Sequence, residues 1–101
     1  MPIIVQRETE RGDAIEVADR VDALLTAVER VGSKRFAMLR YIDPYGDTTF
    51  NQPMLPDVLK DLDQLLALAI TPDERTIAEQ LRRMAERCLG QVHEYLKFLG
   101  D

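Results

Sequence analysis

An eleven-residue stretch from Asp43 to Pro53, rich in proline, glycine and short polar side chains, most constrains the fold of this chain. It reads Asp-Pro-Tyr-Gly-Asp-Thr-Thr-Phe-Asn-Gln-Pro, which matches neither the period of a strand nor that of a helix. Connections in compact domains are usually about four to six residues long, and longer ones are often functional. The sequence therefore predicts a loop here that separates a strand-containing half from a helical half. It is also the first place to look for a site.

The N-terminal residues predict a β-hairpin. Residues 3–8 begin with three β-branched side chains, and residues 14–18 alternate apolar and polar positions. Gly12 lies between them and can take the positive φ that a tight reversal needs. The alternative is a helix that begins near residue 14, because Asp13 and Glu16 fit a capping box. The hairpin is favoured.

A helix and a third strand are expected before the loop. Residues 20–31 repeat apolar side chains at spacings of three and four, which predicts a helix. Asp19 is the expected N-cap, and Gly32 stands where a left-handed C-terminal residue belongs. Residues 36–42 are apolar on both faces except at Arg40, which predicts a strand buried inside the sheet.

Two helices are expected after the loop. Residues 55–69 place leucine, valine and alanine on one face, and three polar side chains line the other, namely Asp57, Asp61 and Gln64. Thr71-Pro72-Asp73-Glu74 is a capping box with proline at the first helical position. From there an apolar stripe continues to Leu99 with an interruption at Gly90, so the last helix is expected to reach that end.

These elements predict one α+β domain over residues 1–101, in the order ββαβαα. About three strands form a small sheet, and three helices pack mainly against one of its faces. A chain of 101 residues is long enough for a hydrophobic core. If the apolar stripe of residues 55–69 exceeds what the sheet covers, the surplus would form a homodimer surface.

The composition indicates an acidic folded domain and argues against several function classes. Apolar residues make up 46% of the chain and charged residues 31%, as in globular proteins. The 13 basic residues are scattered and the net charge is −5, which argues against binding to nucleic acid or anionic membranes. No apolar run approaches the roughly 20 residues of a membrane span, and a signal-peptide pattern is absent. Cys88 is the one cysteine, so a reducing cytoplasm is expected.

The loop matches a calcium-binding pattern only in part. Asp43, Tyr45 and Asp47 stand at alternate positions, like the first three ligands of an EF-hand loop. The sixth position is Thr48 instead of glycine, and the twelfth is Met54 instead of a bidentate glutamate. We therefore expect no EF-hand site, and no metal or cofactor.

Cys88 and His93 are the single cysteine and the single histidine. Five positions on a helix separate two side chains by about 140°, so the pair does not converge on a zinc ion or form a nucleophile and base. We expect Cys88 to be a small core residue. We expect His93 to be partly buried and hydrogen-bonded to another element, with a role as catalytic base as the alternative.

The loop side chains have both structural and functional interpretations. Asp43 begins a type I turn that ends at Gly46, and such an aspartate usually bonds its own backbone. The loop aromatics pack onto the core or serve as exposed anchors for a partner. The candidate contact residues are Asp43, Tyr45, Asp47, Thr48, Thr49, Phe50 and Asn51, with Arg40 and His93 as secondary candidates.

Two segments resemble a known family. Residues 40–51 contain a DPYGDTxFN-like loop, and residues 93–101 form a HEYLKFxGD-like C-terminus. Both are similar to a family of small bacterial cytosolic proteins without an assigned activity. The resemblance covers most of the chain, including the N-terminal hairpin, and implies no functional residue.

Three function classes follow in order of support. The first is a protein-interaction module that contacts a partner through residues 43–53, and an acidic surface favours a basic partner. An inhibitor- or immunity-type protein is one form of such a module. The second is a small-ligand or cation-binding protein that uses four side chains of the loop, Asp43, Asp47, Thr48 and Asn51. An enzyme is the third.

Overall fold

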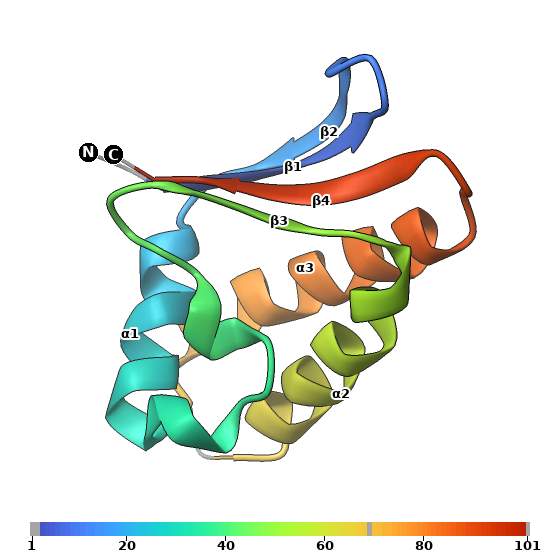
Figure 1. Cartoon of the computed structure of the whole chain (residues 1–101). Helices are drawn as coiled ribbons and strands as arrows, with labels where there is room; N and C mark the ends of the chain where they lie inside the picture. The colour runs from blue at the N-terminus through green and yellow to red at the C-terminus, as the bar shows by residue number, and fades with distance from the viewer. Residues whose placement is uncertain (1–2, 69, 101) are drawn as a thin grey trace.

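A four-stranded antiparallel sheet and three α-helices make up the fold, as described by a computed structural model for residues 3–68 and 70–100. In chain order the elements are β1 (Ile4–Thr9), β2 (Ala14–Ala18), α1 (Val21–Val31), β3 (Asp47–Phe50), α2 (Leu55–Leu66), α3 (Pro72–Leu89) and β4 (Glu94–Leu99). The strand order in the sheet is β2-β1-β4-β3, and all three helices lie on one side of it (Figure 1). The predicted α+β class is confirmed. The order ββαβαα holds for the first six of these elements, and a fourth strand follows them.

The N-terminal hairpin is confirmed, so the alternative helix near residue 14 is wrong. Val5 pairs with Ala18, and the chain reverses through Gly12 at a φ of 86°. The helix α1 is also confirmed, but Asp19 is not its cap. The N-cap is Arg20, which takes a left-handed conformation without a side-chain capping bond. Gly32 ends the helix at a φ of 117°.

Residues 36–42 do not form the predicted strand. Their backbone makes a 3-10 turn at Leu39–Tyr41 instead. The cause is Asp61 of α2, whose carboxylate accepts the backbone N–H groups of Ala37, Met38 and Leu39 at 3.2, 2.7 and 3.0 Å. A strand would need these donors for its neighbours in the sheet. Asp61 was expected on the exposed face of its helix, yet it is only 4% exposed.

The last helix stops earlier than predicted. It ends at Leu89, and residues expected to continue it form β4 between β1 and β3. Burial then alternates along the strand, with Leu96 and Phe98 in the core. Gln52 supports this change of structure, because its side-chain amide donates to the carbonyls of Cys88, Gln91 and Glu94 at 2.7, 2.6 and 3.1 Å. The predicted loop is corrected as well, since its Asp47–Phe50 portion is the edge strand β3.

The core lies between the helices and the inner face of the sheet. In α2 four members of the apolar stripe are fully buried, namely Leu55, Val58, Leu62 and Leu65. Leu59 and Leu66 of the same stripe are partly buried. The homodimer surface that an apolar surplus on this helix would form stays a prediction. Ala69, predicted as part of this stripe, lies outside the described residues.

The predicted capping box at the start of α3 is confirmed and extends into an ion pair. The Thr71 backbone N–H donates to Glu74 Oε1 at 3.0 Å, and the Glu74 N–H donates to Thr71 Oγ1 at 3.2 Å. Arg30, in the last turn of α1, donates two hydrogen bonds to the Glu74 carboxylate at 2.7 and 2.5 Å. These bonds, from Arg30 first and Thr71 next, lower the pKa of Glu74 to about 2.

None of the helices in residues 3–68 and 70–100 is long and apolar enough to cross a membrane.

Candidate functional site at the Asp43–Gly46 turn

The turn that follows the Leu39–Tyr41 segment is held by its own backbone and side chains. The Tyr45 N–H donates to Asp43 Oδ1 at 2.9 Å, and the Gly46 N–H donates to the Asp43 carbonyl at 3.4 Å. The Asp43 N–H in turn donates to Thr48 Oγ1 at 3.0 Å. The predicted turn and its bracing by Asp43 are therefore present. These bonds fix the backbone of the turn at Tyr45.

The end of β4 also fixes the turn. The Gly100 N–H donates to the Gly46 carbonyl at 2.9 Å. A Cβ atom on Gly100 would lie 2.5 Å from the Gly46 nitrogen and 2.7 Å from the Asp43 carbonyl oxygen. Only glycine fits there without a shift of the turn. The two segments with the family resemblance thus lie side by side, because β3 pairs with β4 and the turn contacts Gly100.

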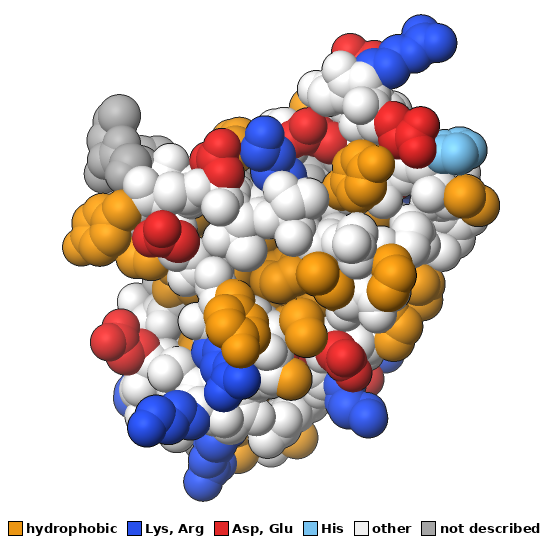
Figure 2. All heavy atoms as spheres, viewed as in Figure 1, with side chains coloured by type: hydrophobic (Ala, Val, Ile, Leu, Met, Phe, Trp, Pro, Cys, Tyr) orange, Lys and Arg blue, Asp and Glu red, His pale blue; other side chains and the backbone are white. Residues whose placement is uncertain are grey.

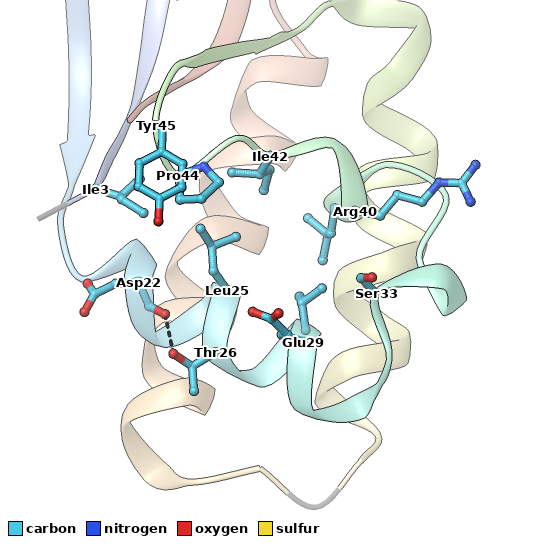
Figure 3. Close-up of a pocket in the computed structure, with 12 residues that line it drawn as sticks. Ile3, Asp22, Leu25, Thr26, Glu29, Ser33, Arg40, Ile42, Pro44 and Tyr45 are labelled. Carbon is cyan, nitrogen blue, oxygen red and sulfur yellow. Dashed lines mark hydrogen bonds between the residues drawn. The ribbon is translucent and has the colours of Figure 1, made fainter. Parts of the chain in front are cut away.

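Tyr45 stands at the tip of this turn and is 83% exposed. Beside it lies a cavity of about 490 Å³ between α1 and the 39–45 segment (Figure 3). Its apolar lining is formed by Ile3, Leu25, Val28, Leu39, Ile42 and Pro44. In Figure 3 the Tyr45 hydroxyl points toward α1, and Leu25 rises from α1 beneath it. We call this hollow the α1 groove.

The rim of the α1 groove is polar and mainly acidic on the α1 side. Asp22 and Glu29 line it, and both residues are exposed. They are seven residues apart, about two helical turns, and so lie on one side of the helix. Arg40 lines the opposite end, where its guanidinium points away from the hollow (Figure 3). An apolar floor beside two carboxylates suits an apolar group that has a cation next to it.

The face around the turn carries further exposed apolar groups. Figure 2 shows hydrophobic side chains gathered over the 39–54 segment and α2. Besides Tyr45, the large exposed hydrophobic residues of that segment are Tyr41 and Met54. Arg40, the one charged residue of the segment predicted as a buried strand, is exposed. Its guanidinium stacks on the Tyr41 ring at 4.8 Å from the centroid and donates to the Tyr41 hydroxyl at 2.9 Å.

The other loop candidates do not all reach the groove. Asp47 and Thr49 are exposed in β3, and the Asp47 carboxylate lies 3.9 Å from Lys97 Nζ. Phe50 is buried and packs edge-to-face on Phe98, with ring centroids 5.7 Å apart. Asn51 is exposed just after β3.

His93 lies at the opposite end of β4 from the turn. Six residues of strand at roughly 3.3 Å each separate them by about 20 Å. Its Nδ1 is 2.7 Å from Glu10 Oε1, so the expected bond to another element is confirmed. The expected partial burial is wrong, because His93 is exposed.

Cys88 is fully buried, as expected of a core residue. Burial first, and the charge of Glu94 next, raise the pKa of its thiol to about 11. A thiol in this state is a poor nucleophile at neutral pH. Within residues 3–68 and 70–100, no group of three or more His, Cys, Asp or Glu side chains is placed to hold a metal ion.

The α1 side of the groove and a charge cluster on the inner face of the sheet were not predicted from the sequence. The spacing of Asp22, Leu25 and Glu29 places them on one helical face, and this pattern could have indicated the α1 side of the groove. The charge cluster joins Arg7 to Glu94 at 2.8 Å and to Glu16 at 3.3 Å, and Arg87 to Glu16 at 2.5 Å. The sequence pattern that could have indicated the cluster is the position of Arg7, two residues after the buried Val5, because such residues share one face of a strand.

Comparisons with known proteins do not place the chain in a family. No protein-family model, no curated protein and no solved structure matches it. The resemblance of its loop and C-terminus to small bacterial proteins therefore stays a prediction.

Proposed function

We propose that this protein is an interaction module that binds a segment of a partner protein through Tyr45 and the α1 groove. The observation that carries the proposal is a highly exposed aromatic side chain on a turn that is already fixed. Tyrosine is enriched at the centres of protein interfaces, and a rigid support lowers the entropy that binding costs. The cavity of about 490 Å³ beside it lies within the usual range for ligand sites.

The chemistry of the groove suggests what the partner segment contains. Leu25, Ile42 and Pro44 favour an aliphatic or aromatic side chain in the hollow. Asp22 and Glu29 favour a lysine or arginine next to it, and the net charge of −5 would speed the approach of a basic partner. An inhibitor- or immunity-type role in the cytoplasm is part of this proposal.

A small-ligand or cation site in the same loop has less support. The Thr48 hydroxyl and one Asp43 oxygen are already bonded to backbone N–H groups. Asp47 lies in β3 beside Lys97, and Asn51 follows the far end of that strand. The four side chains expected to hold such a ligand therefore do not converge.

A peptide-display experiment tests the proposal. A random-peptide phage library is selected on the immobilised protein, and enriched peptides are titrated by NMR. We expect basic peptides with a large apolar residue, and shift changes at Leu25, Ile42 and Tyr45. Tyr45→Ala should weaken binding at least about tenfold, as for an interface hot spot.

The matched control is Val92→Ala, because Val92 is 79% exposed and lies outside the groove. It should bind the same peptides as the wild type does. Equal binding by Tyr45→Ala, or shift changes confined to other surfaces, would contradict the proposed site.

A further inference from the structure

The segment that faces α1 across the groove uses all of its own backbone donors. Within residues 41–46, the first two N–H groups donate to carbonyls three residues before them, at 3.0 and 3.2 Å. The other three donate to Thr48 Oγ1 and to Asp43, and Pro44 has no N–H group. This wall of the groove therefore has no backbone donor left for a partner.

The other wall is the helix α1, whose backbone groups bond one another. A partner in an extended conformation takes its main-chain hydrogen bonds from the edge of a sheet. None of the described residues that line the groove belongs to a strand. A bound segment consequently has to satisfy its own backbone groups, as an α-helix does.

The acidic side chains of the groove have the spacing of a helix. Asp22 and Glu29 both line the groove and are exposed. In Figure 3 Asp22 lies toward the first turn of α1 and Glu29 toward its end. Seven residues at 1.5 Å each separate their backbones by about 10.5 Å along the axis. A partner helix that lies along α1 spans the same distance between two of its own residues seven positions apart.

The apolar floor lies between these two carboxylates. Leu25 is three residues after Asp22 and four before Glu29, so it lies on the same face of α1. Ile42 lines the groove from the opposite wall. On a partner helix, the residues three and four positions after the first cation point to the same side as both cations. Large apolar side chains at those positions would therefore enter the hollow.

We propose that the segment bound in the α1 groove is an amphipathic α-helix of a partner protein. It carries lysine or arginine at two positions seven apart, opposite Asp22 and Glu29, and large apolar residues between them. This helix-in-groove mode needs no backbone contact from either wall. The inference rests on the proposed function, because it describes the partner of the same groove.

Two designed phage libraries test the conformation of the partner. Both display peptides of about 16 residues, long enough for several helical turns, with lysines fixed seven positions apart. The two positions that face the groove between the lysines are randomised, and the remaining positions are alanine or glutamine. The second library differs by a proline at a central, outward-facing position. The first library should enrich on the immobilised wild-type protein, and the second should not.

Peptides enriched from the first library are then synthesised. They should gain helical circular dichroism when they bind, and change the NMR shifts of Leu25, Ile42 and Tyr45. Proline at the central position should weaken binding at least about tenfold, because it breaks the helix.

Charge reversal tests the contact with α1. Glu29→Lys should weaken binding at least about tenfold, because it sets like charges against each other. Replacing one of the two peptide lysines with glutamate should restore binding to this variant, and the lysine that does so gives the direction of the helix. Glu79→Lys is the matched control, since it makes the same change at an exposed glutamate of α3 outside the groove, and it should bind as the wild type does. If Glu29→Lys is unfolded, Glu29→Gln should weaken binding at least about threefold.

The outcomes separate this inference from the proposed function. Groove binding by the proline library, or by peptides that gain no helicity, would overturn the helix and leave the proposed function standing. The same holds if groove-binding peptides come from the random library alone with basic residues about three apart, the spacing that spans this distance in an extended chain. If no peptide from any of the three libraries shifts the groove residues, the proposed function and the helical partner both fail.

Discussion

Gly100 donates its backbone N–H to the Gly46 carbonyl at 2.9 Å and leaves no room there for a side chain. The last strand of the sheet thereby ends against the turn that presents Tyr45. A change at the end of β4 should consequently reach the proposed binding surface, although Gly100 does not line the groove.

Substitution of this glycine should both destabilise the fold and displace the turn. The added methyl group of Gly100→Ala would lie 2.7 Å from the Asp43 carbonyl oxygen, so the turn must move. We expect a loss of about 1–3 kcal/mol in the free energy of unfolding, measured by urea denaturation. Gly90→Ala is the control, because its methyl group would meet the nearest backbone atom at an ordinary 3.6 Å. Equal effects of the two variants would contradict the tight contact.

Asp61→Asn tests the anchor that prevents residues 36–42 from forming a strand. The amide replaces one of two oxygens that together accept three backbone N–H groups, so at least one buried donor loses its partner. We expect a loss of about 2–4 kcal/mol in unfolding free energy, and faster amide exchange at residues 37–39. Asp57→Asn, at an exposed position of the same helix, should cost less than about 1 kcal/mol. Unchanged exchange at residues 37–39 would count against the anchor.

Elements with local signals were predicted well from the sequence. The hairpin has β-branched residues on both sides of Gly12, and α3 begins with the Thr71–Glu74 capping box. The Asp43–Gly46 turn has each residue type where a type I turn needs it. In these cases the residues that determine the structure are neighbours in the chain, so their pattern is sufficient.

Elements decided by distant contacts were not predicted. The sequence of residues 94–99 fits both the alternation of a strand and the apolar stripe of the preceding helix. Pairing with β1 and β3, together with the hydrogen bonds of Gln52 to the end of α3, selects the strand. The conformation of residues 36–42 is determined by their hydrogen bonds to Asp61, which lies 24 positions after Ala37 in the chain. The α1 groove likewise needs the 39–45 segment to cross α1, and no local pattern specifies that crossing. The sequence alone predicted the turn as a candidate site, but it did not predict that the turn and α1 form a groove together.

The Arg30–Glu74 pair should make stability depend on acid pH. The folded-state pKa of Glu74 is about 2, below its ordinary value of 4.5, so the carboxylate stabilises the fold fully above about pH 5. That contribution is lost as the pH falls from about 5 toward 2, because the unfolded chain takes up the proton first. Urea midpoints measured between these values should fall steeply for the wild type. The urea midpoints should fall less for Glu74→Gln, which is less stable than the wild type at neutral pH. The control is Glu79→Gln, at an exposed site of the same helix, and its midpoints should fall as those of the wild type do. Parallel curves for the wild type and Glu74→Gln would show that this ion pair does not set the acid sensitivity.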